Sequence, residues 1–271
     1  VAVFEGISPF FADVDQSVPG QELVTTVSDT GKGAELRIYH GKTLELLARS
    51  DSIGQSNRWR HQLLHASFGS GNRRLVDILT PHLGKTVEFF RLDGSQLLKS
   101  EDITGYTTHK YNSRNLDMGG GADMDNDGEI EVVAFSDSWS QANGIQLQRS
   151  GSSFQAYEVW DWDLASEATS NLAGTTLYYP EELSSCTDAF SGSEQGTAML
   201  AVGSGSVLNV MMGHRLPDTL GASGPVITTP TPCDCDNAFS TASPTRSSFV
   251  LTSQLLAIIT LLTLCSQWIA S

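Results

Sequence analysis

Three segments of the sequence repeat one another, and this repeat limits the folds open to the chain more than any other feature. The segments begin with "FADVDQ", "HASFGS" and "GADMDN", and their equivalent alanines, Ala12, Ala66 and Ala122, lie about 55 residues apart. In each segment a polar loop leads into a short apolar strand, a turn with glycine follows, and alternating apolar and polar residues come next. Alternation with a period of two predicts antiparallel meanders, so we expect an all-β fold.

Units of this length with roughly four strands each are typical of β-propeller blades. We expect repeats at approximately 11–65, 66–120 and 121–170 and a degenerate fourth at 171–216, which gives a propeller domain over 1–216 with three to four blades. The sequence leaves open whether the opening "VAVFE" pairs with the last blade to close the ring or whether the chain is a fragment of a larger propeller. An elongated array of β-sandwiches is the structural alternative, although sandwich repeats are usually about 100 residues long.

The loop that opens the third segment, "DMDNDGEIE", has the pattern of a calcium site. Calcium takes six to eight oxygen ligands, and a D-x-D-x-D-G loop supplies them by turning alternate carboxylates inward. The predicted ligands are Asp123, Asp125 and Asp127, then the backbone carbonyl of Glu129 and the carboxylate of Glu131. A helix-flanked EF-hand is a poor alternative, because its twelfth position holds an alanine here instead of a glutamate. An ordinary turn of Asp, Asn and Gly without an ion is the other reading.

The equivalent loops of the other two segments carry fewer carboxylates. The first segment keeps Asp13 and Asp15 and reaches Glu22 after an inserted Pro-Gly, which predicts a weaker second site. The second segment has serine and glycines at the ligand positions, so we expect no cation there. The other two loops have lost some or all of these ligands, while the strands that follow them are retained. This pattern favours an ion that stabilises a blade over an ion that takes part in substrate binding or catalysis.

These loops and the sequences that connect them resemble those of FG-GAP/VCBS-type repeat proteins, whose blades are related to the integrin α-chain propeller. The likeness rests on "FADVDQ" and "GADMDNDGEIEVV" as blade-entry loops and on the connections "IGQSNRWRHQ", "TPHLGKTVEFFRLDG" and "GYTTHKYNSRNLDMGGG", and it covers about Ser8 to Trp160. The resemblance implies a propeller that binds calcium in its blade loops and serves as an extracellular or periplasmic scaffold. The family usually places Asp where this chain has Glu131, so that residue is a departure.

Charge and motif content narrow the functional classes. Sixteen basic against thirty-one acidic residues give a net charge of −15, which disfavours nucleic acid and anionic membrane surfaces and favours divalent cations. The six histidines form no H-E-x-x-H or H-x-H pair, and neither G-x-S-x-G nor a P-loop motif is present, so we expect no enzymatic activity. Trp160 and Trp162 are either a platform for a sugar or protein partner or part of the core.

The C-terminal part differs in composition from the repeats. Residues 217–248 are rich in Ser, Thr and Pro and predict a disordered stalk, while 249–271 carry no charge and predict a hydrophobic helix. Small residues, a polar spacer and an apolar tail match the signal for a glycosylphosphatidylinositol anchor, which we favour over a membrane-spanning helix because such a helix usually carries Lys or Arg on its cytoplasmic flank and this tail does not. Cys186 suits a disulfide with one of Cys233 and Cys235 in an oxidising compartment.

Together these features predict a non-catalytic, calcium-stabilised propeller at the cell surface. It would act as a recognition, adhesion or scaffold module whose loops contact an extracellular protein or glycan, with the membrane reached through the C-terminal tail. The alternative is an accessory propeller domain of a larger secreted or surface hydrolase.

Overall fold

A computed structural model describes the following residues: 2–55, 58–69, 72–125, 127–177 and 197–213. Every regular element in these ranges is a β-strand, so the predicted all-β fold is confirmed. Among these residues no helix is long and apolar enough to cross a membrane. The predicted linker 217–248, the hydrophobic tail 249–271 and all four cysteines lie outside the described residues.

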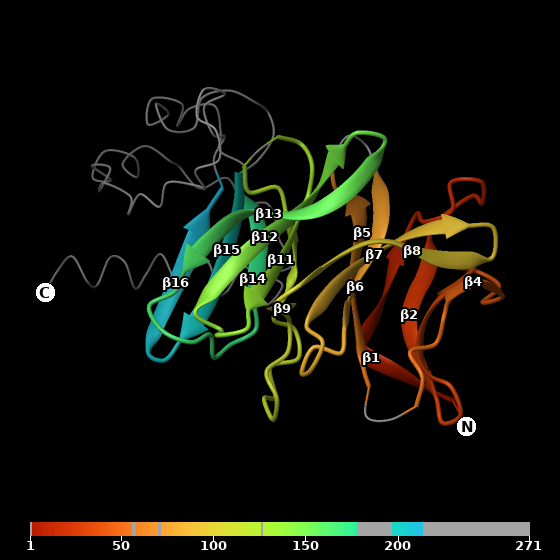
Figure 1. Ribbon diagram of the computed structural model, residues 1–271, viewed down its shortest axis with the longest axis horizontal. Coiled ribbons are helices and arrows are strands. Elements are labelled where there is room, and N and C mark those ends of the chain that lie inside the picture. The colour runs from red at the N-terminus through yellow and green to blue at the C-terminus, as the bar shows by residue number, and fades with distance from the viewer. Residues whose placement is uncertain (1, 56–57, 70–71, 126, 178–196, 214–271) are drawn as a thin grey trace, which may run out of the picture. The chain divides into compact units, whose positions relative to one another are not determined.

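The first eight strands form one sheet, sheet A, in the order β1-β2-β3-β4-β8-β7-β6-β5 (Figure 1). Their bounds are Ala2–Ala12 (β1), Glu22–Asp29 (β2), Gly33–Tyr39 (β3), Leu46–Ser50 (β4), Arg60–Ser67 (β5), Arg73–Leu79 (β6), Thr86–Asp93 (β7) and Gln96–Thr104 (β8). β1–β4 and β5–β8 are antiparallel meanders, which we call the first and second meanders. They are joined by a short parallel pairing of β4 with β8. Because β5 also contacts β1, β2 and β3, sheet A is nearly closed and barrel-like.

Two smaller sheets follow along the chain. Their strands are Tyr106–Thr107 (β9), Gly120–Ala122 (β10), Glu131–Ser136 (β11), Gln141–Ser150 (β12), Ser153–Asp163 (β13), Ala173–Leu177 (β14), Thr197–Ser204 (β15) and Val207–Met212 (β16). In sheet B, β10–β13 form a third antiparallel meander and β9 pairs with β11. Sheet C contains β14, β15 and β16. The described residues thus show successive meanders, and a ring of propeller blades is not among the features they show.

The turns between paired strands use the residues that the repeat pattern predicted. Gly94, in the "DG" turn between β7 and β8, has a φ of 58°, and Gly151, in the "SGS" turn between β12 and β13, has a φ of 64°. Such positive φ angles are open to glycine without steric cost and suit two-residue hairpin turns. Each glycine therefore sets the register of the strand pair that it connects.

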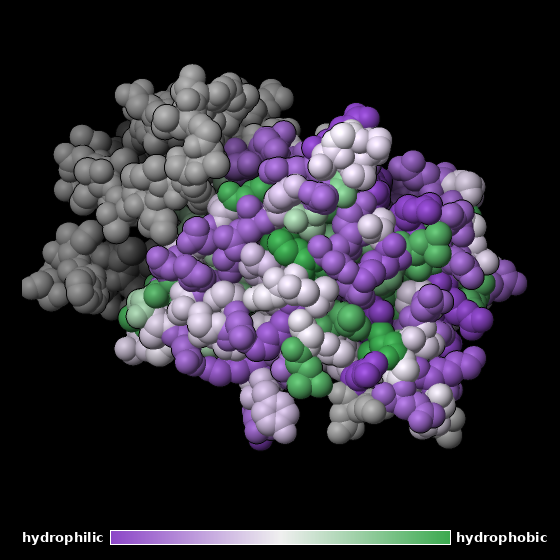
Figure 2. Space-filling view, in the orientation of Figure 1, coloured by the Kyte–Doolittle hydropathy of each residue, from purple (hydrophilic) through white to green (hydrophobic). Residues whose placement is uncertain are grey.

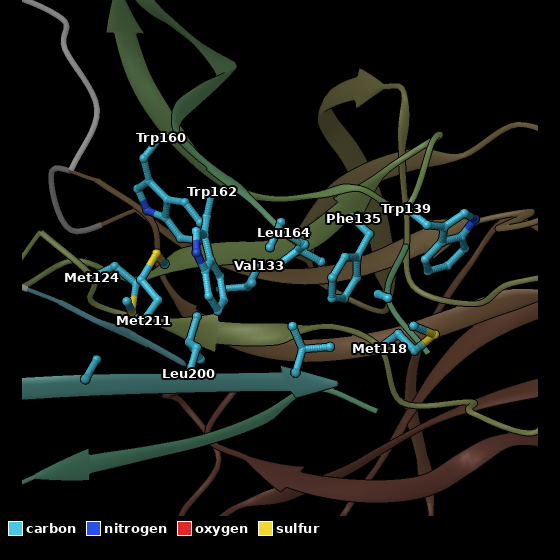
Figure 3. Packing of buried hydrophobic residues seen from close by; sticks show 14 residues of the cluster. Met118, Met124, Val133, Phe135, Trp139, Trp160, Trp162, Leu164, Leu200 and Met211 are labelled. Carbon is cyan, nitrogen blue, oxygen red and sulfur yellow. The ribbon is translucent and has the colours of Figure 1, made fainter. Parts of the chain in front are cut away.

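Three apolar layers lie between successive meanders and sheet C. The first layer joins the first and second meanders through Val24, Leu36, Ile38, Leu75 and Phe90. The second joins the second and third meanders through Val76, Ile78, Phe89, Val132 and Ile145. The third joins the third meander and sheet C through Val133, Phe135, Trp160, Trp162, Leu200 and Met211 (Figure 3). Since neighbouring residues of a strand point to opposite faces, β6 and β11 each contribute to two layers.

The two tryptophans of "VWDWD" belong to the third layer. Trp160 and Trp162 are 3% and 4% exposed, and Figure 3 shows both rings directed into the layer beside Met211. Of the two readings that the sequence allowed, the structure therefore supports the core and not an exposed aromatic platform. The face shown in Figure 2 is mostly hydrophilic, with separate apolar residues between polar ones.

Packing in the third layer leaves no room at Gly144 of β12. A Cβ atom added there would lie 2.1 Å from ring atoms of Trp160, far inside van der Waals contact. We expect Gly144→Ala to lower the free energy of unfolding by about 1–3 kcal/mol, because the indole must move within a close-packed core. Urea denaturation of the two proteins measures the difference.

Gly120 of β10 is the matched control for this substitution. Its added Cβ would meet no atom within 4 Å, and its φ is not positive. We expect Gly120→Ala to change the stability by less than about 0.5 kcal/mol. Equal losses for the two variants would contradict the packing of Trp160 against Gly144.

Candidate metal centre

The three repeated loops occupy the same position in their meanders. Residues 13–21 connect β1 with β2, residues 68–72 connect β5 with β6, and residues 123–130 connect β10 with β11. In every case the loop joins the first strand of a four-stranded meander to the second. The sequence repeat is thus repeated in space, although only the third loop holds the full set of carboxylates.

Four carboxylates converge in the third loop. One oxygen each from Asp123, Asp125, Asp127 and Glu131 lies within 4.8 Å of the others, a spacing that a metal ion could bridge. Asp123 and Asp125 are partly buried, Asp127 is exposed and Glu131 is fully buried. The sequence named all four residues as ligands, and the structure brings them together.

The aspartates also shape the loop through backbone hydrogen bonds. The amide of Asp127 donates to Asp123 Oδ1 (3.1 Å) and to Asp125 Oδ1 (3.2 Å), and the amide of Gly128 donates to Asp123 Oδ2 (3.0 Å). Gly128 has a φ of 89°, which favours glycine at the turn. The carboxylates are thus oriented toward the loop interior by its own amide groups.

Glu131 reaches the group despite its longer side chain. It is the first residue of β11, and its Oε2 accepts a hydrogen bond from the amide of Met124 at 2.8 Å. Its Oε1 accepts one from Gln146 Nε2 at 3.2 Å, and the Trp160 indole nitrogen lies 3.5 Å from Oε2. The buried glutamate therefore holds the loop against the strands as well as adding a fourth carboxylate.

Glu129 has a different position from its four neighbours. Its side chain lies outside the carboxylate group, and Glu129 Oε2 accepts a hydrogen bond from the amide of Gly69 in the second loop, at 3.2 Å. Next to it, the amide of Ile130 donates to the carbonyl of Ser67 at 3.0 Å, and the amide of Leu147 donates to the carbonyl of Phe68 at 2.9 Å. The third loop is therefore fastened to the second loop, and the candidate centre lies at the joint between the second and third meanders.

Burial and mutual repulsion disfavour ionisation of the carboxylates in the third loop. Burial raises the pKa of Glu131 to about 8, and the charges of Asp125 and Asp123 add to the rise, while the Met124 amide acts against it. Burial also raises the pKa of Asp125 to about 6, with further contributions from Asp127 and Asp123. A cation between these groups would offset their repulsion and stabilise the ionised forms.

The first loop does not assemble a comparable group. Among the described residues, only the third loop brings three or more such side chains together, and Asp13, Asp15 and Glu22 do not form such a group. Glu22 is nevertheless buried like Glu131, and its Oε2 accepts hydrogen bonds from the amides of Val14 (2.8 Å) and Asp15 (3.1 Å). A glutamate at the start of the second strand thus holds the loop in both meanders.

Sequence reasoning missed Gln146 as a residue of this centre. Its side-chain amide lies 3.2 Å from Glu131 Oε1 and 3.4 Å from Asp127 Oδ2, and the residue is 8% exposed. The alternation of Ile145, Gln146 and Leu147 is that of a strand with one solvent-facing side, so nothing in the sequence indicated that Gln146 is buried with Ala142–Leu147 of β12. Buried amides are almost always hydrogen-bonded, so such a residue indicates a polar partner nearby.

We found no match to the chain among models of known protein families or among curated proteins. The FG-GAP/VCBS resemblance stays a prediction from the quoted motifs.

Proposed function

We propose that the chain is a calcium-stabilised propeller-type module that serves as an extracellular recognition, adhesion or scaffold domain. The convergence of Asp123, Asp125, Asp127 and Glu131 at the joint between two meanders is the observation that carries the proposal. A cation at this place would brace the contact between loops on which a binding surface depends. The proposed role is binding and not catalysis, because the carboxylates are engaged in holding their own loop.

Calcium is the cation that this ligand set suits best. Its donors are carboxylate oxygens, and hard oxygen donors select calcium or magnesium over softer metals. Magnesium requires near-ideal octahedral geometry and keeps several waters, whereas calcium accepts irregular sets of six to eight oxygens. A loop with four carboxylates of unequal length, one of them fully buried, favours the more tolerant ion.

The propeller reading draws support from the way the meanders pack. The second and third meanders lie on either side of one apolar layer, and the third meander and sheet C on either side of another, in chain order, as blades do. The first and second meanders differ from separate blades, because β4 and β8 join them within one sheet. The equivalent loops between first and second strands also recur at the position that the repeat assigns to blade entry. The proposed module is therefore a set of three blades with β14–β16 as the remainder of a fourth.

Calcium binding should release a proton, because the cation competes with protons for Glu131. With a pKa of about 8 for Glu131 and about 6 for Asp125, the free centre holds on the order of one proton at pH 7 and almost none at pH 9.5. Isothermal titration calorimetry in buffers of different ionisation enthalpy counts the released protons. We expect about one at pH 7, close to zero at pH 9.5, and a loss of the released proton in Glu131→Gln.

A binding screen tests the recognition role itself. Beads coated with the full chain are offered to glycan arrays and to extracellular-matrix proteins in calcium and in EDTA, with Asp125→Asn as the matched variant. The proposal expects at least one ligand that binds in calcium and is lost both in EDTA and with the variant. Calcium binding without any calcium-dependent ligand would leave the ion as a purely structural one and reject the recognition role.

A place at the cell surface, through a lipid anchor attached near the C-terminus, is part of the same proposal. It draws support from the charge-free 249–271 and the Ser/Thr/Pro-rich 217–248. Release of the expressed protein from cells by a phosphatidylinositol-specific phospholipase is the expected result, and retention after treatment would favour a spanning helix.

A further inference from the structure

Four rings form a cluster where three separate segments meet. This ring cluster consists of Trp59, which precedes β5, His61 on β5, His82 in the turn between β6 and β7, and His109, which follows β9. The Trp59 ring stacks on His61 with centroids 5.3 Å apart and meets His109 edge-on at 5.2 Å. The rings of His82 and His109 are 4.5 Å apart. The cluster thus connects the entry to the second meander, one of its turns and the chain leading to the third meander.

Hydrogen bonds determine which nitrogen carries the proton in the central pair. His109 Nε2 lies 3.2 Å from the carbonyl oxygen of Ser113, which can only accept, so Nε2 carries the proton. In the neutral ring His109 Nδ1 is then an acceptor, and His82 Nε2 donates to it at 3.0 Å. His82 Nδ1 is buried and has no hydrogen-bond partner. With both rings neutral, every ring nitrogen of the pair except His82 Nδ1 is therefore hydrogen-bonded.

A further proton has no favourable place in this arrangement. On His82 Nδ1 it would sit on a buried atom that makes no hydrogen bond, and on His109 Nδ1 it would face the N–H of His82. The surrounding charges do not compensate: Lys85 lies near His82 and is paired with Asp137, while His61 faces His109. The Tyr111 ring contacts His82 edge-on, and His61 Nδ1 is bonded to Thr108 Oγ1 at 2.7 Å. In the described part of the chain no carboxylate pairs with these rings.

We propose that the ring cluster is an acid-sensitive latch. While His82 and His109 are neutral, their hydrogen bond holds the turn at 80–85 and the connection at 105–118 against Trp59. Protonation of the pair breaks that hydrogen bond, and the two segments separate from the tryptophan. The latch works without the cation, so it stands even where the calcium proposal fails.

The direction of the titration agrees with this geometry. Burial lowers the pKa of His61 to about 4, and the neighbouring His109 adds to this effect. Burial, His109 and Lys85 also lower the pKa of His82, against a backbone hydrogen bond with His109. Because unfolded His61 and His82 take up protons near pH 6.5 and the folded residues do so only at lower pH, their contribution to stability is full above about pH 6.5 and is lost as the pH falls through the lowered folded pKa values. The latch should therefore open on acidification below about pH 6.5.

Hydrogen exchange with mass spectrometry tests the latch on the full chain. Labelling times are adjusted so that the intrinsic exchange at pH 7.5 and at pH 5.0 is equal. We expect the protection of the amides of 80–85 and 105–118 against exchange to fall by about tenfold or more at pH 5.0, which is the change that one unit of pKa produces. The amides in the strands of the first meander should keep their protection. Unchanged protection of these two segments at pH 5.0 would overturn the proposal.

His82→Gln is the informative variant. The NH2 group of the introduced glutamine can donate a hydrogen bond to Nδ1 of neutral His109. If the amide rotates, the glutamine oxygen can instead accept a hydrogen bond from protonated His109. The two segments of this variant should therefore keep their protection against exchange at pH 5.0. His65→Gln is the control, because burial also lowers the pKa of His65 to about 4 and His65 is outside the ring cluster. This control should lose protection at pH 5.0 as the wild type does. Equal acid responses of His82→Gln and the wild type would reject the latch.

Nitrogen-15 spectra of the wild-type imidazoles provide a second measurement that needs no variant. At pH 7.5 both His82 and His109 should carry their proton on Nε2, and His82 should titrate below pH 6.5. A Nδ1-protonated His109, or an ordinary titration of His82, would equally contradict the proposal.

Discussion

Saturating calcium should raise the melting temperature of the full chain by about 5–10 °C over the EDTA-treated protein. A ligand at one hundred times its dissociation constant stabilises the folded state by about 2.7 kcal/mol. In a domain of 150–250 residues each kcal/mol moves the melting temperature by about 2–4 °C. Differential scanning calorimetry at pH 7.5 with calcium and with EDTA isolates the contribution of the cation.

Two variants separate the candidate centre from general charge effects. Asp125→Asn removes a central, partly buried carboxylate and should abolish most of the shift. Asp93→Asn removes a carboxylate from an exposed ion pair with Arg91 and should leave the shift unchanged. An identical melting temperature of the wild type in calcium and in EDTA would refute a structural ion at this loop.

Arg60→Met should be the most destabilising single change in the second meander, at about 3–5 kcal/mol at pH 7.5. Arg60 Nη1 binds Asp77 Oδ2 at 2.6 Å and Glu88 Oε2 at 2.8 Å, and all three residues are buried. Removal of the cation leaves two buried carboxylates with Lys99 as the remaining positive partner of Glu88, at 3.4 Å. Loss of one member of a buried ion pair costs this much because an uncompensated charge stays in the interior.

The loss should shrink at acid pH. Burial raises the pKa of Asp77 to about 7, with Arg60 opposing the rise and Glu88 adding to it. A carboxyl whose folded pKa lies above its unfolded value of 3.8 contributes stability at low pH that is lost as the pH rises through the folded pKa. The difference between variant and wild type in urea denaturation should therefore be smaller at pH 5 than at pH 7.5.

Arg91→Met on β7 is the control for this prediction. Arg91 pairs with Asp93 at 3.1 Å on the surface, with about half of each side chain exposed. Exposed pairs of this kind contribute about 0–1 kcal/mol. If both arginine variants lose the same free energy, the ion cluster of Arg60 is not buried as described.

Local sequence patterns were sufficient to predict the strands and most of the residues of the candidate metal centre. The alternation in "VEFFRL" and "IQLQR" predicted strands of the second and third meanders, and the spacing of Asp123, Asp125 and Asp127 predicted a shared site. Both signals arise from residues close together in the chain, where the period of a strand or a turn determines which side chains meet.

The partners in contacts between distant segments were not given by such local patterns. Gln146 reaches Glu131 across a strand pair, His82 reaches His109 from a different turn, and Arg60 reaches Asp77 across a hairpin. Each depends on the register between strands, which one sequence does not determine. The ring of blades expected from the repeat length, and the C-terminal helix, are likewise not shown by the described residues.

The shared apolar layers imply that the sequence repeat and the unit of folding are different. β6 contributes Leu75 to one layer and Val76 to another, and β11 does the same with Val132 and Val133. The second or the third meander cut from the chain would leave both of its faces uncovered, as in solenoid proteins whose repeats depend on their neighbours. Folding should therefore be cooperative across repeats, and the smallest stable truncation should contain at least two adjacent meanders and the layer between them.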